Sequence, residues 1–286
     1  MLTFNITLMK KIIIFSLLIF SLIINTNVFS QEKDNSGTNP ANFTYDARFY
    51  SEMAGFSDPG GSYLTNYMEF RLPLGRDIVK AAGLDNESVI HDLGKKFGAR
   101  IRFRYKDLNI ETPGAGAFEN SNVSGIGDID ARVLWMAYGS KNVIVVPGLE
   151  ATFNTSSHDA LGYGANVLAP TLFGVFPGLL GKGSLFAPGY QYLFDVDGGD
   201  DNDINRSQLD LYFVWLLGKG ANWLIVDPQI IYDHATGAIP ALVELEYGYM
   251  IKALPGASVY LRPGVGIGAD RPYDWNFEGG LKFVWR

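Results

Sequence analysis

The last fourteen residues of the chain, 273–286, read YDWNFEGGLKFVWR. Side chains alternate between the two faces of a β-strand, so this stretch divides into two sets. One set is aromatic and aliphatic: Tyr273, Trp275, Phe277, Gly279, Leu281, Phe283 and Trp285. The other is mostly polar or charged: Asp274, Asn276, Glu278, Gly280, Lys282, Val284 and Arg286. A tilted strand of about 9–11 residues crosses a bilayer, so this strand is long enough to span a membrane.

The same alternation recurs between turn signals from residue 42 onward. It predicts twelve strands, at residues 42–53, 63–74, 99–108, 128–138, 142–154, 163–176, 184–194, 207–217, 222–233, 239–251, 258–270 and 273–286. Short connections alternate with longer polar ones at residues 111–127, 155–162, 195–206 and 234–238. Short periplasmic turns and long outer loops are typical of outer-membrane barrels. We therefore expect an all-β fold, an antiparallel transmembrane β-barrel of about twelve strands.

Residues 75–98 depart from this pattern, because they form a long connection on the expected periplasmic side and include a helix-like segment at 77–97. They are compatible with a periplasmic cap, with a plug, or with an error in the first two predicted strands. The sequence does not distinguish these alternatives, and it does not indicate an oligomeric state.

The N-terminus has the pattern of a secretory signal peptide. Lys10 and Lys11 precede an apolar run at 12–24, which is too short to span a membrane as a helix. Val28 and Ser30 are small residues at suitable positions for cleavage before Gln31. We expect residues 1–30 to be removed, residues 31–41 to form a disordered linker, and residues 42–286 to form the barrel. An N-terminal anchor helix is the alternative.

Composition excludes several functions. The chain has no cysteine, which excludes disulfide frameworks, thiolate metal sites and cysteine nucleophiles. Its formal net charge is −7 and it contains no basic run, so nucleic acid is not an expected partner.

The five tryptophans are predicted to point outward: Trp135, Trp215, Trp223, Trp275 and Trp285. Four of them lie near expected periplasmic strand ends, as an aromatic girdle at a membrane interface requires. A soluble periplasmic β-sandwich would explain the alternation but not this clustering.

The polar faces of the strands are expected to line the lumen. The lumen-lining candidates are Arg100, Arg102, Arg104, Lys106, Asp128, Asp130, Arg132, Glu150, Asp210, Glu244, Glu246 and Glu278. Two interpretations remain open: an ion-pair ladder that fills a closed barrel, or a charged constriction that selects what passes.

Other inward positions are apolar and lie toward the periplasmic end: Leu134, Met136, Val214, Leu216, Leu224 and Met250. This combination suits a small amphipathic or hydrophobic solute, and it also suits a plugged barrel. One predicted strand is irregular, because its alternation directs Asp227 toward lipid. The adjacent Pro228 suggests a bulge that resets the register.

Catalytic and metal-binding patterns are weak. His91, His158 and His234 have no zinc-binding spacing, and the Ser156-Ser157-His158 order differs from that of outer-membrane phospholipases. We therefore expect no enzyme and no cofactor, with a lipid-modifying enzyme based on His158 or His234 as an alternative. One acidic loop is a calcium candidate, through Asp195, Asp197, Asp200, Asp201 and Asp203. It lacks the EF-hand pattern, and a solvated loop is the simpler interpretation.

Two short motifs point to a family. GIGDID at residues 125–130 and LGYGAN at 161–166, followed by Pro170, resemble the outer-membrane "MetA-pathway of phenol degradation" family of transporters. The resemblance covers roughly residues 120–286 and implies a barrel that passes small, aromatic compounds. The C-terminal strand is also similar to the last strand of outer-membrane barrels, which implies recognition by the barrel-assembly machinery.

We conclude from the sequence that the chain is a channel or transporter for small molecules in the bacterial outer membrane. Its expected partners are outer-membrane lipid, a small-molecule solute and the assembly machinery. A closed structural or adhesive barrel is the main alternative.

Overall fold

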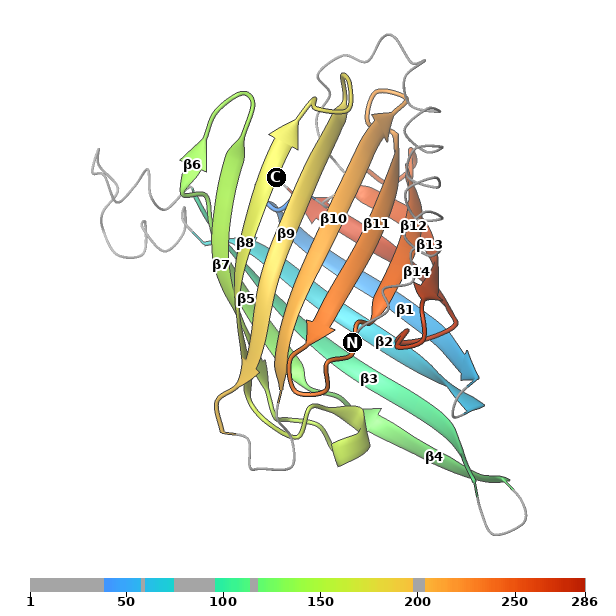
Figure 1. Cartoon of the computed structure of the whole chain (residues 1–286). Coiled ribbons are helices and arrows are strands. Elements are labelled where there is room, and N and C mark those ends of the chain that lie inside the picture. Colours follow the sequence, from blue (N-terminus) through green and yellow to red (C-terminus); the bar gives the residue numbers. More distant parts are fainter. Residues whose placement is uncertain (1–38, 58–59, 75–95, 114–117, 198–203, 286) are drawn as a thin grey trace.

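The computed structural model describes residues 39–57, 60–74, 96–113, 118–197 and 204–285. These residues form β1 (Tyr45–Ser57), β2 (Gly60–Pro73), β3 (Phe97–Pro113), β4 (Phe118–Ile126), β5 (Ile129–Trp135), β6 (Tyr138–Gly139), β7 (Ile144–Phe153), the 3-10 helix η1 (Asp159–Leu161), β8 (Val167–Pro177), β9 (Ser184–Asp195), β10 (Asn205–Leu217), β11 (Asn222–Asp233), β12 (Ala241–Met250), β13 (Ala257–Ile267) and β14 (Trp275–Trp285) (Figure 1). No helix within these ranges is long and apolar enough to span a membrane. The predicted signal peptide and nearly all of the connection at residues 75–98 lie outside the described residues.

The strands close into a barrel. Each strand pairs antiparallel with its neighbours, and the sheet closes because β2 pairs with both β1 and β3. β4 and β5 share one position, since both pair with β3, and β6 only adds two residues beside β7. The result is a closed antiparallel barrel of 12 strand positions, which confirms the predicted fold class. The C-terminal strand β14 lies between β1 and β13.

The two ends of the barrel differ. At one end, which we call the turn end, short turns join β8 to β9, β10 to β11 and β12 to β13. In the β10–β11 turn, Gly218, Lys219 and Gly220 have φ angles of 56°, 63° and 72°. Glycine adopts this left-handed conformation at little cost, which permits the tight reversal. At the opposite end, the loop end, β3 and β4 project beyond the other strands (Figure 1).

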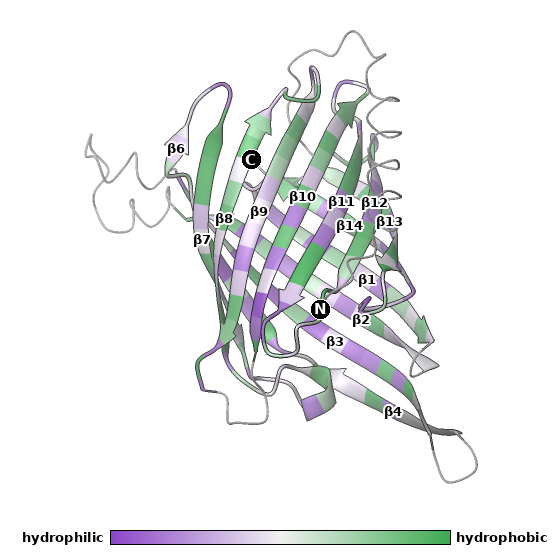
Figure 2. Cartoon of the chain, viewed as in Figure 1, coloured by the Kyte–Doolittle hydropathy of each residue, from purple (hydrophilic) through white to green (hydrophobic). Residues whose placement is uncertain are grey.

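The outward and inward faces of the strands differ in chemistry, and the strands in Figure 2 alternate in hydropathy along their length. Exposed apolar side chains of the outward face include Phe49, Met68, Tyr105, Leu149, Leu172, Tyr190, Leu245, Leu261, Phe277 and Leu281. Trp135, Trp275 and Trp285 are also exposed on this face. An apolar outward face with polar groups inside is the arrangement that a hydrocarbon environment favours.

The lumen at the turn end is filled with apolar side chains. The buried cluster consists of Ala41, Val146, Phe173, Val175, Leu185, Ala187, Val214, Leu216, Trp223, Ile225 and Tyr260. Phe43 packs against this cluster, and its ring lies against Gly98, where no Cβ would fit. The segment 39–44 therefore folds into the lumen before β1 begins.

The register predicted for β11 is wrong. Trp223 is fully buried in the lumen, and Asp227 is 1% exposed and faces inward rather than toward lipid. Leu224 consequently belongs to the opposite, outward face. The pairings with β12 run in one register from Asn222 to Ile230, so Pro228 introduces no shift. No bulge is needed to bring Asp227 inside, because the face of β11 that was predicted to point outward lines the lumen.

The predicted outer loop at residues 111–127 is also mostly strand. β3 continues to Pro113 and β4 begins at Phe118, and the two form a long antiparallel ladder. The predicted strand at 128–138 ends at Trp135, after which only the short β6 follows.

Candidate functional site in the barrel lumen

A cavity of about 440 Å³ occupies the lumen. Its lining comes from β1–β3, β5 and β7–β14, together with the segment 39–44. Its volume lies within the range of small-molecule pockets, roughly 300–1,000 Å³. The cavity is therefore large enough for a small solute, and its chemistry is set by three groups of charged side chains.

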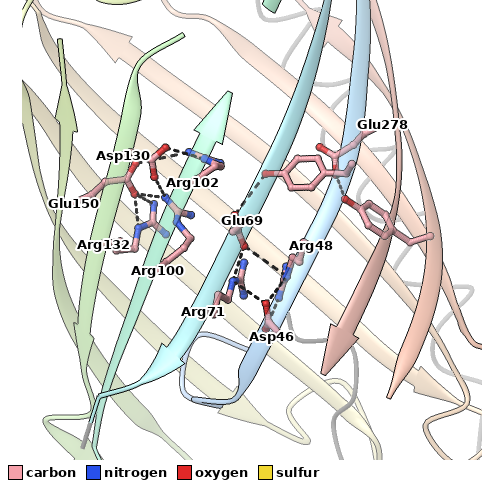
Figure 3. A network of polar contacts seen from close by, with 12 residues as sticks. Asp46, Arg48, Glu69, Arg71, Arg100, Arg102, Asp130, Arg132, Glu150 and Glu278 are labelled. Carbon is pink, nitrogen blue, oxygen red and sulfur yellow. Dashed lines mark hydrogen bonds and ion pairs between the residues drawn. The ribbon is translucent and has the colours of Figure 1, made fainter. Parts of the chain in front are cut away.

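The first group, which we call the basic wall, comprises Arg100, Arg102 and Arg104 of β3, Asp130 and Arg132 of β5, and Glu150 of β7. Arg100 Nη2 lies 2.7 Å from Asp130 Oδ1 and 2.8 Å from Glu150 Oε2. Asp130 Oδ2 also accepts from Arg102 Nε at 2.8 Å (Figure 3). The same oxygen pairs with Arg104. Alternate residues of β3 point inward, so one carboxylate on the adjacent β5 serves three guanidinium groups.

Arg132 completes the basic wall. It pairs with Glu150, which lies opposite it in the β5–β7 register. The wall thus holds four guanidinium groups and two carboxylates. Like charges at this spacing repel unless matched, so Asp130 and Glu150 are the groups that allow the arginines to lie side by side.

A second group on β1 and β2 is balanced. Arg48 Nε lies 3.1 Å from Asp46 Oδ1, and Arg71 Nε lies 2.6 Å from Glu69 Oε1. Arg48 also approaches Glu69 at 3.6 Å, so the four side chains form one network (Figure 3). The two cations and two carboxylates of this network balance each other.

The third group, which we call the acidic wall, comprises Asp210 of β10, Asp227 of β11, Glu244 and Glu246 of β12, Arg262 of β13, and Glu278 and Lys282 of β14. Arg262 contacts Asp227 and lies 2.6 Å from Glu244 Oε2. Lys282 Nζ lies 2.7 Å from Glu246 Oε1. Five carboxylates therefore share two cations.

Tyrosine hydroxyls supply further hydrogen bonds around the cavity. Tyr63 and Tyr67 both donate to Glu52, at 2.8 and 2.9 Å. Tyr260 donates to Glu278 at 2.6 Å. The Tyr67 ring also faces the guanidinium of Arg102 at 5.7 Å, a cation–π arrangement that helps to orient the arginine.

The twelve lumen-lining candidates occupy different positions. Arg100, Arg102, Arg104, Arg132, Glu150, Asp210, Glu244, Glu246 and Glu278 line the cavity. Asp130 is fully buried behind the arginines. Lys106 lies further toward the loop end and is not part of the cavity lining. Asp128 is buried at the loop end, where its carboxylate accepts from the backbone N–H groups of Thr155, Ser156 and Tyr163. Asp128 therefore organises an outer loop.

Sequence reasoning missed several charged residues of the lumen: Asp46, Arg48, Glu52, Glu69, Arg71, Asp227, Arg262 and Lys282. Most of them obey the same alternation and could have been found by applying it to every strand. Asp227 was missed because β11 was assigned the wrong face.

The acidic loop lies mostly outside the described residues, which include Asp195 and Asp197 but not Asp200, Asp201 or Asp203. Asp195 accepts from the backbone N–H of Ile204, and Asp197 accepts from Asn166. Within the described part of the chain, no group of three or more His, Asp or Glu side chains is placed to hold a metal ion.

Two of the three histidines are described. His158 Nδ1 accepts from the backbone N–H of Ala160. His234 Nε2 lies 2.9 Å from Ser207 Oγ on the exposed surface of the loop end. A serine hydrolase requires such a contact, together with a group that orients the imidazole. No carboxylate of the described residues hydrogen-bonds to His234 Nδ1.

The closed barrel is similar to solved outer-membrane channels. The COG4313 outer membrane channel from Pseudomonas putida F1 matches with a TM-score of 0.55, covering 91% of this chain and 100% of that chain at 10% identity. The NanC porin matches with a TM-score of 0.54, covering 84% and 98% at 10% identity. The KdgM porin matches with a TM-score of 0.51, covering 84% and 99% at 11% identity.

The fold is that of an outer-membrane porin. At these identities the likeness establishes the architecture and leaves solute and residue roles open. No family model and no curated protein matches the chain. The resemblance to the "MetA-pathway of phenol degradation" family therefore stays a prediction.

Proposed function

We propose that this protein is an outer-membrane channel that passes small solutes passively through a charge-lined lumen. One observation carries the proposal: a closed barrel with an apolar outward face encloses a cavity of about 440 Å³ lined by charged side chains. A barrel that served only as a scaffold would not need so large a polar interior. The likeness to porins supports this function, and KdgM porin has been solved in complex with disordered oligogalacturonate.

The lumen favours an amphipathic solute. Its charged part would meet the basic and acidic walls, and its apolar or aromatic part would meet the cluster at the turn end. Leu134 and Phe173 line the cavity beside the arginines, so both chemistries are available within one site. This pairing supports the small hydrophobic or aromatic solutes that the sequence predicts.

The proposed function also implies how the chain is oriented in the outer membrane. Residues 1–30 would be removed as a signal peptide, the turn end would face the periplasm, and outer-membrane lipid would contact the outward face. The barrel-assembly machinery would recognise β14, whose outward aromatic residues end at Trp285.

Planar-bilayer conductance of the purified, detergent-folded protein tests the proposal. We expect discrete single-channel steps. Folded and inserted protein that gives no ion current and no solute flux into proteoliposomes would contradict it, and would favour a closed barrel in which the apolar cluster and the ion pairs fill the lumen.

The contact between Ser207 and His234 supports a second candidate, a lipid-modifying enzyme. In that case the protein would release fatty acid from phospholipid vesicles, and both Ser207→Ala and His234→Ala would abolish the release. If the unmodified protein releases no fatty acid from the vesicles, this candidate is excluded.

A further inference from the structure

The basic wall, which carries an excess of positive charge, faces the acidic wall, which carries an excess of negative charge, across the lumen. In the closed ring of strands, β5 lies opposite β12, β3 opposite β11, and β7 opposite β13. The strands that carry the four arginines therefore face the strands that carry most of the acidic wall. Both walls line the same cavity. Among the described residues, no ion pair connects one wall with the other, because each arginine of the basic wall pairs only with Asp130 or Glu150.

Two carboxylates of the acidic wall, Asp210 and Glu278, lie outside the ion pairs of its described residues. Among the described residues, Asp210 accepts hydrogen bonds only from the amide of Gln208, at 2.9 and 3.2 Å. Glu278 accepts only from the hydroxyl of Tyr260 within the same part of the chain. Neither forms an ion pair within the described residues. A buried carboxylate is costly unless a cation or several hydrogen bonds compensate it, so this wall is suited to an incoming cationic group.

The basic wall has the opposite property. Each guanidinium carries five N–H donors, so two carboxylates cannot accept from every donor of four arginines. The side chains of Arg102, Arg104 and Arg132 remain 20%, 15% and 18% exposed, so part of each guanidinium faces the cavity. Guanidinium groups bind carboxylate, sulfonate and phosphate through paired hydrogen bonds. An anionic group on a solute would therefore find donors here.

We infer that the lumen contains a binding site for small zwitterionic solutes, which carry one anionic and one cationic group. The anionic group contacts Arg102 and Arg104, and the cationic group contacts the acidic wall at Glu278 or at Asp210. A solute that is only an anion is attracted by the arginines but repelled by the excess carboxylates of the acidic wall. A solute that is only a cation is attracted by those carboxylates but repelled by the excess arginines of the basic wall. Only a zwitterion satisfies both walls without adding net charge to the lumen.

This inference rests on the proposed channel function, and proteoliposome uptake separates the two. The probes are taurine, isethionate and ethanolammonium, which share a two-carbon skeleton and are respectively a zwitterion, an anion and a cation. Uptake is measured at zero membrane potential, with empty liposomes as the baseline. We expect taurine to enter about tenfold faster than either singly charged probe, which corresponds to about 1.4 kcal/mol.

Two neutralising variants identify the walls. The double variant Arg102→Gln/Arg104→Gln should slow taurine and isethionate but not ethanolammonium. The double variant Glu278→Gln/Asp210→Asn should slow taurine and ethanolammonium but not isethionate. Lys141→Gln and Asp159→Asn change exposed charges outside the cavity and serve as matched controls. Heat-modifiable migration on gels verifies that each variant still forms a barrel.

The outcomes are distinct. Equal entry of all three probes would overturn the zwitterion site and leave an unselective channel. Faster entry of isethionate or of ethanolammonium than of taurine would overturn it in favour of a simple anion or cation channel. Entry of none of the probes, together with absence of ion current, would overturn the channel function and the site with it.

Discussion

The middle and the turn end of the lumen are built on the same inward positions of the same strands, yet they differ in chemistry. Along β10 the inward residues change from Asp210 to Val214 and Leu216, and along β11 they change from Asp227 to Ile225 and Trp223. The charged residues surround a cavity, whereas the apolar residues pack against one another. The barrel thus combines a polar site with a tightly filled end.

This difference assigns separate roles to the two regions. Charged groups in the middle are stable only when they are paired with each other, with water or with a solute. The apolar cluster needs no such partners. We therefore expect substitutions in the middle to act through unpaired charge, and substitutions at the turn end to act through packing and through the width of the passage.

The largest effect is expected for Asp130→Ala. This carboxylate is fully buried and contacts Arg100, Arg102 and Arg104. Its removal leaves three guanidinium groups with one fewer partner, and breaking a buried ion pair costs about 3–5 kcal/mol. The free energy of unfolding, measured by urea titration of the barrel in lipid vesicles, should fall accordingly. Asp159→Ala, at an exposed position, is the control, and a comparable small change in both variants would contradict the role of Asp130.

The second prediction concerns packing at the turn end. A Cβ on Gly248 would collide with the ring of Trp223, which fills the lumen and donates to Glu246 at 2.6 Å. Gly248→Ala should therefore destabilise the barrel by about 1–3 kcal/mol, as overpacking typically does. At Gly139 the nearest atom to an added Cβ, the sulfur of Met136, is 3.4 Å away. Gly139→Ala should leave the free energy of unfolding almost unchanged in the same urea titration. Equal losses of this free energy in Gly248→Ala and Gly139→Ala would contradict tight packing around Trp223 at the turn end.

The third prediction concerns conduction. Phe43 packs against the apolar cluster at the turn end and belongs to the segment that enters the lumen. Phe43→Ala should widen this end and raise the single-channel conductance, with a small loss of stability because the ring is only partly buried. Phe49→Ala, on the outward face of β1, is the matched control. Unchanged conductance in Phe43→Ala would show that the narrowest part of the passage lies elsewhere.

The smallest effect lies outside both regions, in the β13–β14 loop. Hydrogen bonds from Ser57 and Arg271 hold the pKa of Asp274 below its ordinary value. A carboxyl group whose pKa is lower in the folded chain stabilises the fold above its unfolded pKa of about 3.9, and this stabilisation is lost as the pH falls through the folded value. Asp274→Asn should therefore be slightly less stable than the unmodified protein at pH 7, and the difference should disappear in acid. The two proteins are also compared below ~pH 3, about one unit beneath the unfolded pKa. A stability difference that persists there would contradict this cause.

The same comparison explains what the sequence could predict. Where one face is charged, as on β3 with Arg100, Arg102 and Arg104, the period of two identifies the inward face directly. On β11 both faces are apolar near the turn end, with Trp223 and Ile225 on one side and Leu224 and Val226 on the other. The polar residues that distinguish them, Asp227 and Gln229, come further along the strand, and a bulge at Pro228 was an available but incorrect explanation.

Two other features could not be read from the alternation. β4 contains the run ENSNVSG, whose composition is typical of a loop, and it becomes a strand because its backbone pairs with β3 beyond the other strands. Residues 39–41 were predicted as linker and residues 42–44 as the start of a strand, whereas β1 begins at Tyr45. The place of the segment 39–44 in the lumen depends on the apolar cluster formed by distant strands. The basic and acidic walls likewise face each other only because the barrel closes. The sequence pattern of a single strand cannot predict that arrangement.

The reversal potential in a salt gradient tests the central claim most directly. The measurement compares the unmodified channel with the triple variant Arg100→Gln/Arg102→Gln/Arg104→Gln, after both are shown to be folded. If the basic wall faces the permeation path, removing three positive charges shifts the reversal potential toward cation selectivity. A conducting, folded variant with the selectivity of the unmodified protein would contradict the account, because the arginines would then serve only to hold the barrel together.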